Sequence, residues 1–191
     1  DEGQEVPWLA IADNGSGMSD VELVEAMRPG GRDPLAKRKS DDLGRFGLGL
    51  KTASFSQCRK ITVVSRKDGT TSARQWDLDF VRTQDRWVLR RLSQADIAVL
   101  PGMPTLGESG TLVLWQQMDR LDLGNDLARF PQVLNERIMA VSEHVSLVFH
   151  RFITGEPGRA KIVIAINNAP IEAFDPFQAK RRPPVFSSSG L

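Results

Sequence analysis

The sequence has a single cysteine, Cys58, so no disulfide can form within the chain. It has no uninterrupted apolar run that approaches the length of a membrane span or a signal-peptide core. The formal net charge is only +1, which gives no overall field that would favour nucleic acid or a membrane surface. These absences predict a reducing, soluble compartment, and we expect a cytoplasmic location and no membrane partner.

Metal ligands are also scarce. The two histidines, His144 and His150, form no cluster with cysteine, carboxylates or further histidines at metal-ligand spacing, so we expect no metal site there. No internal repeat is visible. The 191 residues, 40% hydrophobic and 26% charged, are sufficient for one globular domain with a proper core and the start of a second.

A carboxylate follows the first expected strand. The short apolar segment Val6–Ala12 predicts a buried strand, which ends in the sequence D-N-G-S-G-M at positions 13–18. An aspartate at a strand end can accept hydrogen bonds from an amino group such as that of adenine, and glycines beyond it let a planar base approach the backbone. The alternative is an Asx-turn in which Asp13 binds its own backbone.

A helix and a basic loop come next. Ser19 and Glu22 have the spacing of a capping box, and the helix that they begin should end at Pro29. The loop from Arg28 to Asp42 is rich in arginine and lysine. Such a loop is either a solvated surface or, if the turns at its two ends bind one ligand, a basic lid over phosphates.

A glycine-rich junction closes this loop. The sequence G-R-F-G-L-G-L-K-T at positions 44–52 leads into a helix-compatible run, Leu48–Phe55. The first amides of a helix have no intrahelical partner and favour an anion such as phosphate, and Lys51 adds a positive charge. Glycines at a turn can also serve a purely steric purpose, so this motif alone leaves both interpretations open.

Three motifs in this order support a family resemblance. D-x-G-x-G at 13–17, G-x-x-G-x-G at 44–49 and a threonine, Thr111, in the expected strand Gly110–Trp115 resemble the motifs of the GHKL ATPases. That superfamily contains DNA gyrase, heat-shock chaperones, histidine kinases and MutL. G-L-G-L-K-T-A-S-F at 47–55 is similar to its microrchidia-like branch and bacterial relatives. The resemblance implies an α/β two-layer sandwich, with a mixed, largely antiparallel sheet and helices on one face, the Bergerat-type ATP-binding fold.

The resemblance also implies a ligand and residue roles. Asp13 would accept the amino proton of adenine with help from Thr111, the amides of the glycine motif and Lys51 would hold the phosphates, and ATP would bind with Mg²⁺ in the intact protein. The nucleotide-binding residues implied in this way are Asp13, Gly15, Gly17, Met18, Gly44, Arg45, Phe46, Gly47, Leu48, Gly49, Leu50, Lys51 and Thr111.

The catalytic part of the family pattern is not found. In the family, a glutamate that activates water and an asparagine that binds magnesium lie on a helix upstream of the D-x-G-x-G strand. Only twelve residues precede Asp13, and the chain opens with Asp1 and not methionine, which is consistent with a fragment. We therefore expect no catalytic and no metal-binding residue in this chain.

The rest of the sequence predicts further sheet and one long helix. Expected strands cover residues 61–65, 73–80, 86–92 and 162–167, with a hairpin turn at 68–69, an irregular connection over 93–109 and a turn at 168–170. Leu134, Ile138, Val141, Val145 and Val148 predict a helix with one buried face. We expect an N-terminally incomplete ATP-binding domain over 1–160, then a strand and tail over 161–191 that could begin another domain. The basic triplet at 180–182 is expected to be solvated.

Three functions remain open at this stage. The resemblance favours an ATPase in which hydrolysis of ATP to ADP drives a conformational change or a nucleotide-dependent homodimer, with a protein or DNA client unknown. A histidine kinase catalytic domain and a non-hydrolysing nucleotide-sensing module are the alternatives. A Rossmann site is set aside because it needs G-x-G-x-x-G directly after a strand.

Overall fold

The computed structural model describes residues 7–28, 49–119, 129–158 and 160–176. The chain divides into two compact units, residues 1–121 and 122–191. The predicted domain boundary near residue 160 lies inside the second unit, and a domain division at that point remains a prediction.

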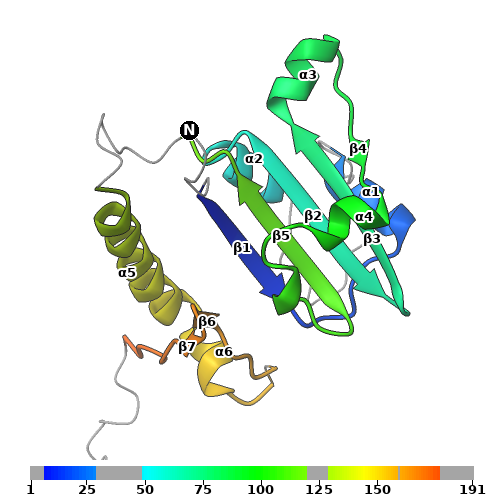
Figure 1. The fold of residues 1–191 in the computed structure, drawn as a ribbon. Coiled ribbons are helices and arrows are strands. Elements are labelled where there is room, and N and C mark those ends of the chain that lie inside the picture. Colours follow the sequence, from blue (N-terminus) through cyan, green and yellow to red (C-terminus); the bar gives the residue numbers. More distant parts are fainter. Residues whose placement is uncertain (1–6, 29–48, 120–128, 159, 177–191) are drawn as a thin grey trace, which may run out of the picture. The chain divides into compact units, whose positions relative to one another are not determined.

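The first unit is built on one antiparallel sheet (Figure 1). Its strands follow one another in space in the order β1-β5-β2-β3-β4, and every described pair is antiparallel. The bounds are β1 (Trp8–Asp13), β2 (Lys60–Lys67), β3 (Thr70–Asp77), β4 (Arg90–Arg91) and β5 (Gly110–Gln116). The predicted α/β fold with a largely antiparallel sheet is confirmed.

The hairpin between β2 and β3 forms where the sequence predicts it. Asp68 and Gly69 have φ angles of 50° and 72°, the left-handed pair that suits a two-residue hairpin turn. The predicted strand over 73–80 is too long, because Asp77 ends it. The Asp77 carboxylate accepts hydrogen bonds from the amides of Asp79 and Phe80, and so starts the helix α3 (Leu78–Gln84).

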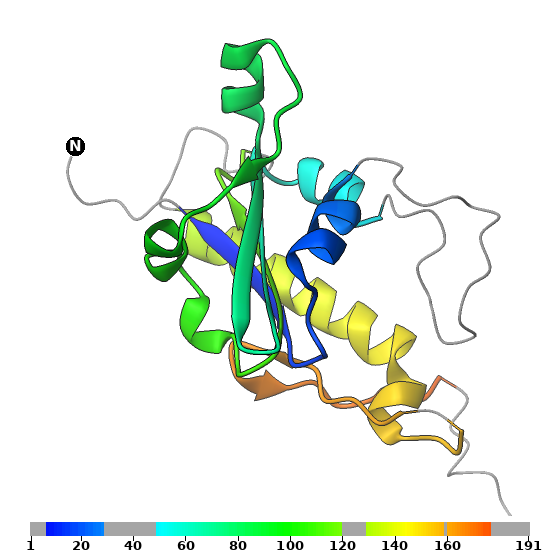
Figure 2. The ribbon, with the colours of Figure 1, turned by 90° about the vertical axis from the view of Figure 1, so that its right-hand side faces the viewer.

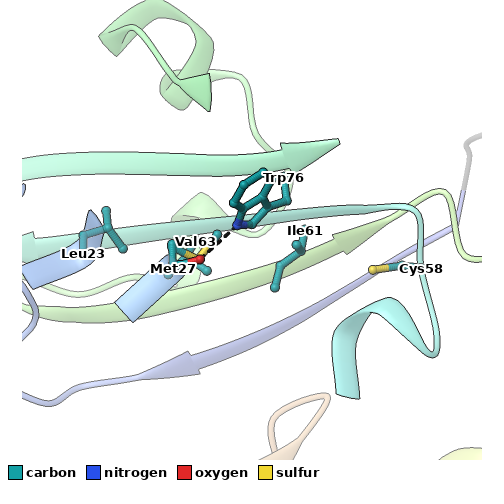
Figure 3. Packing of buried hydrophobic residues seen from close by; sticks show 6 residues of the cluster. All are labelled: Leu23, Met27, Cys58, Ile61, Val63 and Trp76. Atoms are coloured by element: carbon teal, nitrogen blue, oxygen red, sulfur yellow. Dashed lines mark hydrogen bonds between the residues drawn. The ribbon is translucent and has the colours of Figure 1, made fainter. Parts of the chain in front are cut away.

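Two helices, α1 (Asp20–Met27) and α2 (Gly49–Phe55), cover one face of the sheet (Figure 2). Both were predicted, and the capping box of Ser19 and Glu22 starts α1 as expected. The apolar side of α1 packs on β2 and β3 (Figure 3). The buried cluster consists of Leu23, Met27, Cys58, Ile61, Val63 and Trp76.

The other face carries shorter helical segments. The connection predicted as irregular over 93–109 contains α4 (Gln94–Ala98) and a 3₁₀ turn at Met103–Thr105. Ser93 and Asp96 form a second capping box, a signal that was present in the sequence. These segments cover a cluster of Val64, Ala73, Ile97, Leu106 and Leu112. Helices therefore lie on both faces, and the strand predicted over 86–92 is reduced to β4.

The second unit contains α5 (Phe130–Val148), α6 (His150–Thr154) and a small hairpin of β6 (Ala165–Ile166) and β7 (Ala169–Pro170). The long helix was predicted, but Val141 and Val148 are 53% and 51% exposed, so its predicted apolar face is only partly buried. The predicted turn lies one residue earlier, at Asn167 and Asn168, whose φ angles are 49° and 66°. None of the described helices is long and apolar enough to cross a membrane.

The capping box of α1 predicts an acid-dependent loss of stability. The Glu22 carboxylate accepts hydrogen bonds from Lys67 Nζ at 2.8 Å and from the Ser19 amide at 2.7 Å, and these lower its pKa from 4.5 to about 2. Because the folded pKa lies below the unfolded one, the unfolded chain binds more protons between these values, and stability falls as the pH falls through that window.

We therefore predict that Glu22→Gln reduces the fall in unfolding midpoint between pH 4.5 and about 2. Denaturant unfolding over this pH range measures it, with Glu25→Gln in the same helix as the control. Equal pH dependence in the unaltered protein and in Glu22→Gln would contradict the assignment.

Candidate functional site

Three polar side chains form a row across neighbouring strands. Asp13 pairs with Thr111 in the β1–β5 ladder, and Thr111 pairs with Ser65 in the β2–β5 ladder. Paired residues project from the same side of a sheet, with Cβ atoms about 4.5–5.5 Å apart. Ile61 and Val63, which precede Ser65 at a period of two, pack against the α1 cluster, so this polar row lies on the face covered by α1 and α2.

The same face carries apolar residues beside the polar row. Ile11 and Val113 are paired across β1 and β5. Ile11 lies two residues before Asp13, and Val113 lies two residues after Thr111. Ile11 is 54% exposed, and Val113 is half-buried at the margin of the α1 cluster. Within the described residues, the helix-side face of β1, an edge strand, is thus an accessible apolar surface that adjoins the carboxylate of Asp13.

The turn that follows β1 packs tightly on the sheet. Gly17 has a φ of +67°, and a Cβ there would lie 2.0 Å from the carbonyl oxygen of Arg66 on β2. Gly110 has a φ of +128°, and a Cβ there would lie 2.0 Å from the carbonyl oxygen of Asp13. Both positions require glycine for conformation and for space. Gly17, which was predicted to contact a base, therefore packs against β2 on its Cα side, and its contact with a base remains a prediction.

Ser65 joins this turn to the polar row. The Met18 amide donates a hydrogen bond of 2.7 Å to Ser65 Oγ, and Ser65 Oγ also lies 3.1 Å from both the Gly110 carbonyl oxygen and Thr111 Oγ1. The side chain is fully buried. Ser65 was not predicted as a site residue; the available signal was a hydroxyl residue that follows Ile61 and Val63 at the period of two of a strand.

Asp13 adopts the Asx-turn that was left open as the alternative. The Gly15 amide donates to Asp13 Oδ1 at 2.8 Å. The second carboxylate oxygen accepts no hydrogen bond from the described part of the chain, and the residue is exposed. The turn and a ligand contact are therefore compatible, because the backbone fixes one oxygen and leaves the other available.

Lys51 is buried and holds the end of α1. Its ammonium donates to the carbonyl oxygens of Ala26 at 2.9 Å and Arg28 at 2.7 Å, and the Trp76 indole donates to Met27 at 3.0 Å. Burial lowers the pKa of Lys51. Side chains from α2 and β3 thus satisfy the carbonyls that a helix end leaves unpaired. The predicted phosphate contact would need the ammonium to leave these carbonyls, and it remains a prediction.

Part of the predicted phosphate site lies outside the described residues. These are Gly44, Arg45, Phe46, Gly47 and Leu48, together with the predicted lid after Arg28. Gly49 and Leu50 are the first two residues of α2; Gly49 is exposed, and Leu50 packs against the α1 cluster.

Other reactive groups give no second site. The described ranges contain no group of three or more histidine, cysteine, aspartate or glutamate side chains that could hold a metal ion. Burial raises the pKa of Cys58 to about 11, so this thiol is a packing residue and not a nucleophile. His150 Nδ1 lies 2.6 Å from the carbonyl oxygen of Leu147 in its own helix turn.

Comparison with known proteins gives the family. The model of the family described as "Histidine kinase-, DNA gyrase B-, and HSP90-like ATPase" matches residues 2–108 of this chain. The chain belongs to this family. The predicted membership of the GHKL superfamily is confirmed by this match, which includes β1, the polar turn, α2, β2 and β3, but ends before Thr111.

Two curated relatives are bacterial chaperones. The chain is 34% identical to "Chaperone protein HtpG" of Azorhizobium caulinodans over 82 residues, which cover 37% of this chain and 13% of the relative. It is 32% identical to "Chaperone protein HtpG" of Polaromonas naphthalenivorans over 152 residues, which cover 73% of this chain and 21% of the relative. The chain therefore spans about a fifth or less of their length. The similarity to the microrchidia-like branch remains a prediction.

The burial of Lys51 leads to a stability prediction. We expect Lys51→Met to lower the free energy of unfolding by about 1–3 kcal/mol, because the partly buried carbonyls of Ala26 and Arg28 lose their donor. Lys67→Met is the control, since this partly exposed lysine pairs with the Glu22 carboxylate and donates to no helix-end carbonyl in the described residues. Denaturant unfolding measures both variants, and a smaller loss for Lys51→Met than for Lys67→Met would refute the capping role.

Proposed function

We propose that this chain is the ATP-binding domain of a GHKL-type ATPase and that adenine nucleotide binds at the polar row on the helix-side face of the sheet. The observation that carries the proposal is the register that pairs Asp13, at the end of β1, with Thr111, near the start of β5. This pairing brings a carboxylate and a hydroxyl to one edge, beside an accessible apolar surface.

The chemistry of this row suits adenine. Adenine presents an amino donor next to a ring-nitrogen acceptor, and a carboxylate beside a hydroxyl offers the complementary acceptor and donor. Guanine or hypoxanthine would present a carbonyl oxygen to the carboxylate of Asp13, which is unfavourable. Ile11 and Val113, on the same face of the same strands, would contact the face of the base.

The residues proposed to bind the phosphates come from the glycine motif at positions 44–49. In the proposal, the amides from Gly44 to Leu50 bind them, as the family resemblance implies, and Lys51 contributes either directly or by fixing α2 against α1. Magnesium is expected from the family, but the described residues offer no cluster that could hold it, so the base-binding proposal does not depend on a metal.

The proposal for the whole protein goes further. There, ATP would be hydrolysed to ADP and the nucleotide state would drive a conformational change or dimerisation. Because two relatives are named chaperone proteins, we favour a protein over DNA as the client. A cytoplasmic location is proposed from the single cysteine of the chain. The alternatives are a histidine kinase catalytic domain and a sensing module without turnover.

Two assays on the whole protein separate these functions. Steady-state release of phosphate from ATP supports the ATPase, whereas transfer of the γ-phosphoryl group to a histidine of a partner protein supports the kinase. Saturable binding with neither reaction supports the sensing module.

Removal of one charge at Asp13 tests the base site. We predict that Asp13→Asn raises the Kd for ADP by about 10- to 100-fold, because the amide replaces one carboxylate acceptor with a donor and a hydrogen bond to a charged group is lost. Isothermal titration calorimetry measures the Kd.

Asp68→Asn is the matched control, because Asp68 occupies a left-handed turn position that asparagine also tolerates. Equal affinity for ADP in Asp13→Asn and in Asp68→Asn, both folded, would remove Asp13 from the site.

A further inference from the structure

We infer that Ser65 is a positioning and specificity residue of the proposed base site. It would not touch the base itself, but acts through the residues that would. This inference rests on the proposed function. Its basis is that one buried hydroxyl contacts both parts of the site, the turn that carries Asp13 and the side chain of Thr111.

The first contact fixes the turn. The Met18 amide donates to Ser65 Oγ at 2.7 Å, and Gly17, one residue earlier, lies against the Arg66 carbonyl of the same strand. The turn is therefore held on β2 at two successive residues, by close packing at Gly17 and by a hydrogen bond at Met18. Because the other end of the turn holds Oδ1 of Asp13 through the Gly15 amide, Ser65 sets the position from which the carboxylate meets a ligand.

The second contact sets the direction of the Thr111 hydroxyl. Ser65 has a single hydroxyl hydrogen and two acceptors at 3.1 Å, the Gly110 carbonyl oxygen and Thr111 Oγ1. If Ser65 donates to Gly110, then Thr111 donates to Ser65 and presents only lone pairs to a ligand. If Ser65 donates to Thr111, the hydrogen of Thr111 is free to point outward.

Adenine requires the second arrangement, because the ring nitrogen beside its amino group is an acceptor. Hypoxanthine carries a hydrogen on that nitrogen and a carbonyl oxygen in place of the amino group, so it matches neither Asp13 nor an outward Thr111 hydrogen. Adenine therefore selects the arrangement in which Ser65 donates to Thr111, and in that arrangement Ser65 keeps the two side chains in the pattern that distinguishes these bases. Its loss should weaken the binding of adenine more than the binding of hypoxanthine.

The experiment compares ADP with inosine diphosphate by calorimetry on the 191-residue chain. In Ser65→Ala we expect the Kd for ADP to rise about tenfold while that for inosine diphosphate changes by about twofold or less, so that the selectivity falls about fivefold or more. A general loss of stability would shift the unfolding temperature but leave the selectivity of the folded protein unchanged.

Ser72→Ala is the matched control. Ser72 is a buried serine that pairs with Ser65 in the β2–β3 ladder, one strand further from Thr111, so its loss should leave the selectivity intact. If Ser65→Ala does not fold, Ser65→Cys keeps nearly the same volume with a much weaker donor and should lower the selectivity in the same direction.

Selectivity equal to that of the unaltered protein, in folded Ser65→Ala or Ser65→Cys, overturns the inference. A fall of the same size in Ser72→Ala overturns it too, because the effect would then not depend on the polar row. Failure of the unaltered protein to bind ADP saturably overturns the proposed function and with it this inference.

Discussion

The close packing of one turn on two strand ends is the constraint on which the rest of the site depends. Gly17 lies against the Arg66 carbonyl and Gly110 against the Asp13 carbonyl, at distances that leave no room for a Cβ. The Ser65 hydroxyl adds a hydrogen bond to the turn at Met18. These contacts place the carboxylate of Asp13 beside Thr111 without burying it. The carboxylate thus stays accessible to a ligand, while the turn that carries it is packed on the sheet.

Hydrogen bonds at the two ends of α1 stabilise the helix layer. Lys51 and Trp76 together donate to the backbone carbonyls of the last two residues of α1 and of its C-cap, Arg28. Ser19 and Glu22 satisfy its first turn. A charged side chain in a motif read as phosphate-binding is therefore also a structural group, which accounts for its burial. The two roles differ in what they require of the ammonium: the cap needs it inside the helix layer, and the phosphate contact needs it outside.

Much of the fold could be predicted because local rules agreed with the tertiary structure. The capping box at Ser19, the D-G hairpin at 68–69 and the alternating pattern of β2 are local signals, and each gave its element correctly. The order of three motifs gave the family. The family resemblance implied that Asp13 and Thr111 act together on adenine. The strand register that pairs them, and that places Ser65 beside Thr111, is specified by no local pattern. The helix α4 was missed although its capping box was visible, because the glycines and prolines around it dominated the interpretation.

An amide-resolved titration tests most directly whether the row of Asp13, Thr111 and Ser65 is the adenine site. In ¹H–¹⁵N correlation spectra recorded during addition of ADP, the account predicts saturable shifts at the amides of Gly15, Met18 and Thr111, all within hydrogen-bond reach of this row. No comparable shifts are expected at the amides of Asp77 and Leu78, at the opposite end of the β2–β3 pair from Ser65. Saturable ADP binding that leaves Gly15, Met18 and Thr111 unshifted would contradict the account.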